Sequence, residues 1–392
     1  MTAPKGPLSG VRVLDLTHVL NGPFATMLLA HMGADVVKIE HGDGDMFRRS
    51  WMAPDADHDG YESLVVNANK RCITLNLKEP EGKAIFEQLV ALSDVVAENF
   101  SVGTMDRLGL GYEHLAEINP RIVYARSTGY GSTGPYSVGV PAFAYLIMAL
   151  TGWVHSGWAN TDFVAEGTKS IGIGDEAAGV SMALGICAAL YARERSGEGQ
   201  CLEVSMQEAQ LGFMVSSLHT WFEGQAVGGP PSPCADGYVI FHVPDLSQEQ
   251  WAQFCRAMGH PEGVDAPHFA TREQRRANYA DLEVLVGTWV ATKTRAELWQ
   301  IFRDAKVPGA PVLSIGEALE DEHLNAVNGL VDVEDARAGT LRMLRPWIRF
   351  SESETDIRHA GPAIGQHNYE VYGELLGMSA ETVDDLAARA VI

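Results

Sequence analysis

The chain has 392 residues, and its 51 acidic residues outnumber its 29 basic residues to give a formal net charge of −22. A surface this acidic repels a phosphate backbone, so we expect no nucleic-acid partner. With 46% hydrophobic and 20% charged residues, the composition is that of a folded globular protein, and the length predicts two domains or one large domain with an insertion.

Membrane spans, export and disulfides are not expected. The longest apolar stretches, residues 140–153 and 180–191, contain glycine, serine or proline and are shorter than the roughly 20 residues that cross a bilayer. Residues 1–7 carry no apolar signal core. The five cysteines are scattered without a CxxC pair, which is typical of a reduced protein. We therefore expect a cytoplasmic protein that does not associate with a membrane.

Short apolar strands alternate with helical segments in the first part of the chain. One amphipathic helix is expected from Gly22 to about residue 32, and Pro80 is well placed to open another over residues 81–92. Strands are predicted over residues 11–15, 35–39, 73–77, 94–97 and 121–125. Because strands that alternate with helices form parallel sheets covered on both faces, this order predicts an α/β fold.

The pattern becomes mostly helical from residue 142. We predict a long helix over residues 176–195, a strand over 201–205 and another helix over 207–222. Near the end of the chain, a strand is predicted at residues 348–350 and a helix at 368–376.

Composition predicts the domain boundaries. Residues 224–236 are rich in glycine and proline and indicate a linker. The following segment, 237–315, holds one predicted strand and several helices, which indicates a second, smaller domain. We predict a large domain over 1–215 completed by 335–392, a small domain over 230–320, and linkers over 215–230 and 320–335.

Familiar ligand-binding motifs give only weak signals. Residues 129–134 have the glycine spacing of a dinucleotide-binding loop, but Pro135 follows directly and no acidic residue lies about 20 positions on, so we interpret them as a tight loop. Residues 167–170 have the order GTKS instead of the GK[ST] of a phosphate-binding loop. Glu113 and His114 are interpreted as the solvated face of a helix, and we expect no metal site.

Asp175 stands at the start of a long, nearly charge-free helix and has two interpretations. Aspartate is a favoured helix N-cap, which is a purely structural role. The same helix N-terminus would keep the carboxylate ionised at neutral pH and available as a nucleophile. Gly172, Gly174 and Gly179 would leave room for a substrate to approach it. These residues alone leave both interpretations open.

Blocks over nearly the whole chain resemble, in the same order, those of one enzyme family. They are residues 8–17, 22–23, 33–40, 67–71, 98–100, 118–124, 174–175, 196–200, 205–207, 361–368 and 374–377. On these blocks the chain is similar to the family III CoA-transferases, also called the CaiB/BaiF family. The family includes carnitine, bile-acid and formyl-CoA transferases and the α-methylacyl-CoA racemases.

The resemblance implies a CoA-transferase with a Rossmann-like large domain, a smaller α+β domain and an interlocked homodimer. Asp175 would attack a donor acyl-CoA to form a mixed anhydride and then an enzyme CoA-thioester, which a carboxylic acid acceptor resolves. Acyl-CoA is thus expected as a substrate, with no tightly bound cofactor. In similar enzymes a glycine loop covers the intermediate. Residues 228–229 are the nearest equivalent here, although the usual Asn-x-His-Pro run is missing.

The resemblance also implies a set of CoA-binding residues. They are Leu20, His41, Leu75, Asn99, Phe100 and Arg107. The family usually has arginine at the position of His41, so one phosphate contact is expected to be weaker or pH-dependent here. Arg107 would supply fixed positive charge that offsets the acidic surface locally.

Two alternatives to a transferase remain at this point. A racemase needs an acid/base pair on either side of the substrate carbon. In the racemase branch a His-Asp pair follows the Gly-Pro loop, but residues 134–143 contain neither residue type, which favours a transferase. The other alternative is a noncatalytic acyl-CoA-binding protein. Trp51, Trp153, Trp158 and Phe143 are candidates to line an acyl pocket, although aromatic residues more often belong to the core.

Overall fold

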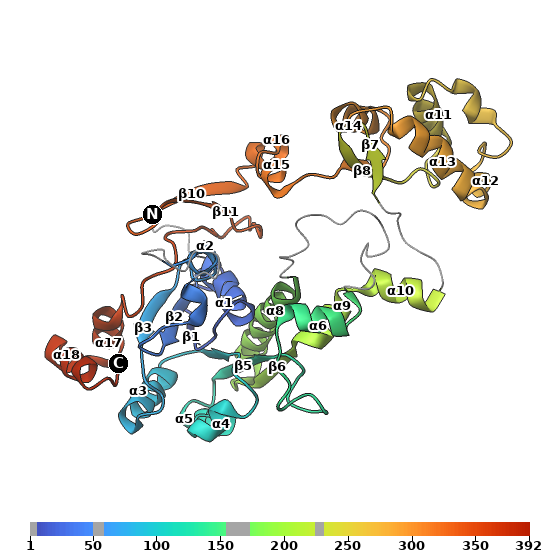
Figure 1. Ribbon diagram of the computed structural model, residues 1–392. Coiled ribbons are helices and arrows are strands. Elements are labelled where there is room, and N and C mark those ends of the chain that lie inside the picture. The colour runs from blue at the N-terminus through green and yellow to red at the C-terminus, as the bar shows by residue number, and fades with distance from the viewer. Residues whose placement is uncertain (1–5, 50–58, 154–172, 224–230) are drawn as a thin grey trace. The chain divides into compact units, whose positions relative to one another are not determined.

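The computed structural model describes residues 6–49, 59–153, 173–223 and 231–392, which form two compact units (Figure 1). The first unit comprises the described parts of Met1–Val154, Gly167–Met214 and Asn325–Ile392. The second comprises the described part of Val215–Leu324. Each unit has its own hydrophobic core.

A six-stranded parallel sheet forms the centre of the first unit, so the prediction of an α/β protein with a parallel sheet is confirmed. Its strands are β1 (Arg12–Asp15), β2 (Asp35–Glu40), β3 (Arg71–Thr74), β4 (Val95–Glu98), β5 (Val123–Thr128) and β6 (Cys201–Ser205). They lie in the order β3-β2-β1-β4-β5-β6, so the winding direction reverses between β1 and β4. In sheets of this order, ligands bind outside the carboxyl ends of the strands at that reversal.

Two strands are shifted from their predicted ranges. β3 begins two residues before the predicted range 73–77 and ends three residues before its end, and β5 extends three residues beyond the predicted range 121–125. Val37 pairs with Arg71, and Val95 pairs with Val123, so the neighbouring strands decide where each ladder starts. Such a register depends on pairing partners, which the apolar pattern of one segment does not contain.

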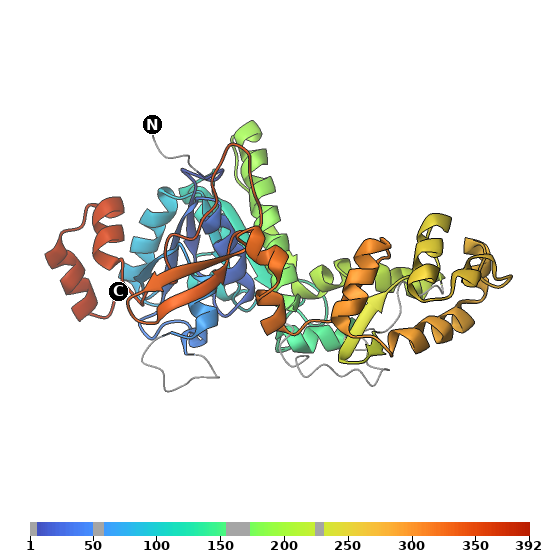
Figure 2. The same cartoon turned by 90° about the horizontal axis from the view of Figure 1, so that it is seen from above.

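Helices cover both faces of the sheet (Figures 1 and 2). One face packs against α3 (Pro80–Ala91), α5 (Tyr112–Ile118), α17 (Asn368–Leu376) and α18 (Ala380–Ala388). The other face packs against α1 (Asn21–His31) and α8 (Ile173–Ser196). α1 is buried on nearly every side between the sheet and α8, so the prediction that it is amphipathic is wrong. Gly179 of α8 permits this packing, because a Cβ there would lie 2.8 Å from the carbonyl oxygen of Asn21.

α8 is long and apolar enough to cross a membrane by length and composition, which the sequence analysis did not expect. Half of its most apolar 18-residue window is buried within the protein. Its buried side chains, including Met182 and Ile186, pack in the same core as α1 and the sheet. Because a core helix of a globular protein passes the same test, this helix is weak evidence for a membrane span.

A β-hairpin and two short helices complete the first unit. The hairpin strands β10 (Leu330–Asp335) and β11 (Gly339–Leu344) pair antiparallel and pack on α2 (Tyr61–Val66). The strand predicted at residues 348–350 is wrong: that segment is irregular, and Ile348 and Phe350 are exposed. An apolar triplet does not form a strand without a neighbour to pair with. α6 (Ala144–Leu150) and α9 (Met206–Gly212) pack against α8.

The second unit is a three-stranded antiparallel sheet packed with helices. Its strands are β7 (Ser232–Cys234), β8 (Gly237–Phe241) and β9 (Gly309–Pro311). Its main helices are α10 (Val215–Glu223), α11 (Gln248–Ala257), α12 (Arg272–Ala277), α13 (Tyr279–Val290), α14 (Arg295–Asp304) and α15 (Ile315–Leu319). Trp251, Phe254 and Phe302 fill the core.

Two predictions near the start of this unit are corrected. Only one strand was predicted here, yet part of the predicted linker is the strand β7, which pairs with β8. Residues 224–230 of that linker lie outside the described residues. The single helix predicted over residues 207–222 is two helices, α9 and α10, separated after Gly212. Glycine is a poor helix former, and α9 ends at this residue.

Candidate active site

The carboxyl edge of the parallel sheet gathers most of the predicted CoA-binding residues. Leu20 lies in the turn between β1 and α1, and His41 and Leu75 directly follow β2 and β3. Asn99 and Phe100 directly follow β4. Parallel strands end at one edge, so the topology brings these five positions together. Arg107 lies on α4 (Thr104–Leu108), which continues the segment after β4.

Asn99 joins the two loops that flank the reversal in strand order. Its Oδ1 accepts a hydrogen bond from the His18 backbone N–H, and its Nδ2 donates to the His18 carbonyl oxygen, both at 2.8 Å. The ring of Phe100 packs edge-on against the His18 ring, with centroids 5.0 Å apart. Val19 has a left-handed backbone with φ of 64°, and its N–H donates to Asp45 Oδ2 at 2.8 Å. The turn before α1 is therefore held from both sides.

Three of the four remaining predicted CoA residues differ in exposure. His41 is exposed, and its Nδ1 lies 3.8 Å from a carboxylate oxygen of Asp43. Leu75 is buried in the core under the sheet, so packing accounts for its side chain. The guanidinium of Arg107 donates to the carbonyl oxygen of Val102 at 3.3 Å and to Thr104 Oγ1 at 2.8 Å, on an exposed helix. Their roles in CoA binding stay predictions.

A buried ion pair beneath this edge was missed by sequence reasoning. Lys70 and Asp15 are fully buried, and Lys70 Nζ lies 2.9 Å from Asp15 Oδ2. Lys70 also donates to the carbonyl oxygen of Pro23 at 3.1 Å, which ties the start of α1 to the sheet. Burial lowers the pKa of Lys70 to about 8. Burial alone would raise the pKa of Asp15, but the charges of Lys70 and Lys38 outweigh it and hold that pKa below its usual value.

Lys38 and Arg48 extend this buried network along β2. Lys38 Nζ, fully buried, donates to the carbonyl oxygen of Thr17 at 2.6 Å in the loop after β1. Arg48 Nε donates to both oxygens of Glu40 at 2.9 and 3.0 Å. The sequence did contain a signal for this network: Lys38 interrupts the apolar run of β2. Because an unpaired lysine is almost never fully buried, a lysine there indicates a buried partner.

Asp175 is the third residue of α8 and half-buried. It therefore lies within the first turn and is not the N-cap, because α8 already includes Ile173. Burial raises the pKa of Asp175 to about 7, and the charge of Glu176 adds to the effect. This desolvation opposes the helix N-terminus, which was expected to keep the carboxylate ionised at neutral pH.

The start of α8 lies beside the turn that leads into α1. Asp175 and Gly179 are one helical turn apart on the same face of α8. A Cβ on Gly179 would contact Asn21, the residue after Leu20. Asp175 thus lies one helical turn before the place where α8 packs on the residue that follows Leu20. Gly174 is buried against α9, since a Cβ there would lie 2.2 Å from Gln210 Nε2. Gly172 lies outside the described residues.

Several buried polar atoms around Asp175 lack partners among the described residues. They are Asn21 Oδ1, Glu176 Oε2 and Gln210 Nε2. Buried polar groups are nearly always hydrogen-bonded, so each of these three atoms needs a partner that the described residues do not supply. Of the predicted acyl-pocket residues, Trp51 and Trp158 lie outside the described residues, Trp153 is half-buried and Phe143 is exposed.

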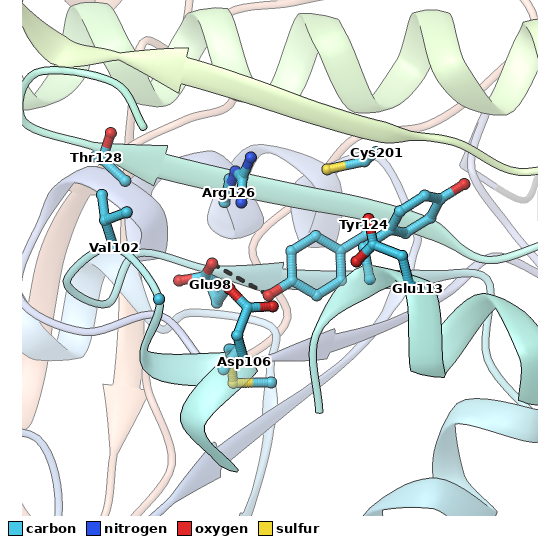
Figure 3. Close-up of a pocket in the computed structure, with 11 residues that line it drawn as sticks. Glu98, Val102, Asp106, Glu113, Tyr124, Arg126, Thr128 and Cys201 are labelled. Carbon is cyan, nitrogen blue, oxygen red and sulfur yellow. Dashed lines mark hydrogen bonds between the residues drawn. The ribbon is translucent and has the colours of Figure 1, made fainter. Parts of the chain in front are cut away.

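A cavity of about 300 Å³ lies along β5, from Tyr124 near its start to Thr128 at its end, and reaches Glu98 at the carboxyl end of β4 (Figure 3). It is lined by Glu98, Val102, Gly103, Met105, Asp106, Tyr112, Glu113, Tyr124, Arg126, Thr128 and Cys201. His114, the residue after Glu113, forms a hydrogen bond between its Nε2 and Glu87 Oε1 at 2.8 Å. Among the described residues no group of three or more His, Cys, Asp or Glu side chains could hold a metal.

Comparisons with known proteins identify the family. The family model described as CoA-transferase family III matches residues 8–368. The β subunit of succinyl-CoA–L-malate CoA-transferase from Chloroflexus aurantiacus is 33% identical, over 98% of each chain. Formyl-CoA:oxalate CoA-transferase from Streptomyces avermitilis is 35% identical, over 98% of this chain and 99% of the relative.

Two solved structures support the same assignment. Rv3272 from Mycobacterium tuberculosis has a TM-score of 0.80 and 27% identity, over 94% of this chain and 99% of that one. A CaiB/BaiF family protein from Brucella suis is similar, with a TM-score of 0.79 and 27% identity over 95% of this chain and 100% of that one. The chain belongs to CoA-transferase family III, and the prediction of a CoA-transferase is confirmed.

Proposed function

We propose that this CoA-transferase moves coenzyme A from an acyl-CoA donor to a carboxylic acid acceptor through the carboxylate of Asp175. The observation that carries the proposal is the position of Asp175, half-buried in the first turn of α8 and beside the turn that leads into α1. That turn lies at the reversal in strand order, where sheets of this kind bind their ligands.

The proposed reaction proceeds by four acyl transfers. Asp175 attacks the donor thioester, which forms a mixed anhydride and releases the CoA thiolate. The thiolate attacks the aspartyl carbonyl, which forms an enzyme thioester and releases the donor acid. The acceptor carboxylate attacks this thioester to form a second anhydride, and the released thiolate attacks the acceptor carbonyl. The last step gives the new acyl-CoA and restores Asp175. Covalent catalysis of this kind divides one difficult exchange into easier steps.

The pKa of Asp175 is consistent with this role and adds a constraint. Only the ionised carboxylate is a nucleophile, and with a pKa of about 7 the free enzyme holds it partly protonated at neutral pH. Exchange should therefore increase as the pH rises through 7. The helix N-terminus favours the ionised form, and burial leaves that form weakly solvated and reactive.

CoA binding is proposed at the carboxyl edge of a Rossmann-like large domain. The turn before α1 and the turn after β4 would hold the cofactor portion of the substrate, and Arg107 would face its phosphates. A smaller domain within residues 230–320 is proposed to complete the enzyme. The donor and acceptor acids are proposed to be like those named for its relatives. We also propose a cytoplasmic location.

An interlocked homodimer is part of the proposal. Two helices of the first unit leave large apolar side chains exposed: Leu184 and Tyr191 on α8, and Tyr145 on α6. Exposed large apolar side chains are candidates for a protein interface, and homodimers are the commonest assemblies. Sedimentation at nanomolar protein should give a dimer, and an active monomer would contradict the proposal.

The covalent intermediate gives the direct test. The enzyme is incubated with succinyl-CoA, quenched with hydroxylamine, digested and analysed by mass spectrometry. A hydroxamate at Asp175 is expected, because anhydrides and thioesters both react with this amine. Asp175→Asn is the matched control and should give none. A racemase would instead wash deuterium into the α-position of a 2-methylacyl-CoA without forming an adduct, and a noncatalytic protein would bind CoA and do neither.

A further inference from the structure

Glu98, the last residue of β4, is buried directly beneath the turn that clamps His18. Its Oε2 accepts the backbone N–H of Phe100 at 2.7 Å, and its Oε1 accepts the hydroxyl of Tyr124 at 3.2 Å. The intervening residue is Asn99, whose amide holds the backbone of His18. A single carboxylate thus fixes the turn from which two of the proposed CoA contacts project.

The cavity beside β4 and β5 brings other charged and titratable groups toward Glu98 (Figure 3). They are Asp106 on α4, Tyr112 and Glu113 on α5, Tyr124 and Arg126 on β5, and Cys201 on β6. Arg126 is itself near an acid, with its Nε 3.5 Å from Glu203 Oε1. Carboxylates outnumber cations around the cavity, and the cavity leaves room for water. The environment therefore favours proton uptake.

Burial raises the pKa of Glu98 to about 7. The Phe100 N–H, the Tyr124 hydroxyl and the charge of Arg126 lower it, and the charge of Asp106 raises it further. Hydrogen bonds to a charged acceptor are about twice as strong as those between neutral groups. Protonation of Glu98 would therefore weaken both bonds that hold the turn.

We propose that Glu98 is a positioning residue for CoA, whose ionised carboxylate holds the turn at residues 99–100 against His18, so that proton uptake at Glu98 loosens this turn and weakens CoA binding. The proposal rests on the proposed function, because it concerns the same edge of the sheet. Glu98 acts through Asn99 and Phe100 and needs no contact with the substrate.

The turn can be observed alone, without any ligand. Asn99 and Phe100 form the only Asn-Phe pair in the sequence. Protein labelled with carbonyl-¹³C asparagine and ¹⁵N phenylalanine therefore gives one selectable amide signal, that of Phe100. In the wild type this signal should shift with a midpoint near pH 7, and in Glu98→Gln the shift should be absent. An amide that does not titrate in the wild type would overturn the proposal.

Two substitutions at neighbouring positions should move this midpoint in opposite directions. Tyr124→Phe removes a hydroxyl that stabilises the ionised form, so the midpoint should rise. Asp106→Asn removes a charge that disfavours the ionised form, so the midpoint should fall. Both keep the size of the side chain, so they test the proposal even if Glu98→Gln folds poorly. A midpoint that neither variant moves would show that another group titrates.

CoA binding is then measured by calorimetry between about pH 6 and pH 8. The wild type should bind about fivefold more weakly at the lower pH, and Glu98→Gln should lose this dependence. The 3′-phosphate of CoA has a second pKa near 6, so 3′-dephospho-CoA is used in parallel to remove that contribution. Binding of equal strength at both pH values would overturn the proposal. Absence of CoA binding at every pH, with a normal Phe100 titration, would instead refute the proposed function and with it the role assigned to Glu98.

Discussion

The two units of the chain bury charge in different ways. In the first unit, Lys70 and Asp15 form an ion pair with both side chains fully buried, directly beneath the carboxyl edge of the sheet. In the described part of the second unit, Arg275 is the one buried charged residue, and its guanidinium meets backbone carbonyl oxygens and lies 5.1 Å from the ring of Trp251.

This difference indicates that buried charge positions loops in the first unit, whereas an apolar core and helix caps stabilise the second. A buried ion pair costs desolvation and is weak evidence for stability, so its place beneath a proposed binding edge indicates that it fixes the loops there. The second unit has an apolar core with aromatic rings, and four of its helices begin with capping boxes. Substitutions of the buried charges beneath the carboxyl edge should therefore change function and stability together, and those in the core and helix caps described for the second unit should change stability alone.

The largest effect is expected for Asp175→Asn. The amide has nearly the size of the carboxylate but is not a nucleophile, so CoA exchange should fall by at least about a thousandfold. CoA affinity should change little. The matched control in the second unit is Asp245→Asn, which removes a half-buried carboxylate paired with Arg276 and should leave exchange intact. Full exchange activity in Asp175→Asn would contradict the proposed mechanism.

The buried ion pair gives the next largest effect. Lys70→Met leaves Asp15 buried without its cation, so the free energy of unfolding should fall by about 3–5 kcal/mol in urea titrations. The control is Arg276→Met, which breaks an exposed pair of 2.6 Å in the second unit. It should cost less than about 1 kcal/mol. Equal losses in the two variants would remove the contrast between the units.

His31, at the end of α1, makes the stability of the first unit depend on pH. Burial, together with the charges of Lys70 and Arg358, lowers its pKa to about 4. The unfolded chain gains a proton near pH 6.5 that the native state does not bind, so stability should be lost as the pH falls from 6.5 toward 4.

The measurement compares the wild type with His31→Leu in urea at several pH values. The variant should lack a slope of about 1.4 kcal/mol per pH unit that the wild type shows in this window. Other groups contribute equally to both proteins, so the difference isolates His31. Identical slopes would show that the native ring is protonated.

The sequence predicted the central sheet well because each strand is a short apolar run between helices. It did not predict that β1 lies between β2 and β4, since strand order depends on how distant segments pair. The hairpin of β10 and β11 was missed because charged residues interrupt both strands, and only the alternation of Val333, Leu341 and Met343 toward α2 reveals it.

The candidate site was less predictable than the sheet. Asp175 came from its place at the start of a long helix together with a resemblance, and the CoA-binding positions after β1, β2, β3 and β4 came from the resemblance alone. The partners of the buried charges could not be predicted, because Lys70 and Asp15 are 55 residues apart and meet only in the folded chain. The burial that raises the pKa of Asp175 could not be predicted either, because burial is a tertiary property.

Two asparagines in the first unit offer a matched pair. Asn99 bridges loops at the carboxyl edge, and Asn119 bridges to the carbonyl oxygens of Val90 and Ser93 at 3.0 and 2.8 Å, before β5 begins. Substitution of either by alanine should destabilise the protein by about 1–2 kcal/mol. Only Asn99→Ala should also weaken CoA binding, measured by calorimetry. Equal CoA affinities in the two variants would place the binding edge elsewhere.

The smallest effect is expected at a helix cap in the second unit. Thr294 Oγ1 accepts the N–H of Glu297 at 3.2 Å, and Glu297 Oε2 accepts the N–H of Thr294 at 2.8 Å, which forms a capping box at the start of α14. Thr294→Ala removes one of these bonds and should cost about 1 kcal/mol without changing CoA exchange. The control in the first unit is Ser379→Ala, where a serine caps α18 at 3.3 Å without a reciprocal bond. Its loss should be smaller, because only the box at α14 satisfies two backbone N–H groups at once. A larger stability loss with Ser379→Ala would contradict the advantage of the capping box. A change in exchange with Thr294→Ala would show that capping in the second unit does more than stabilise its helices.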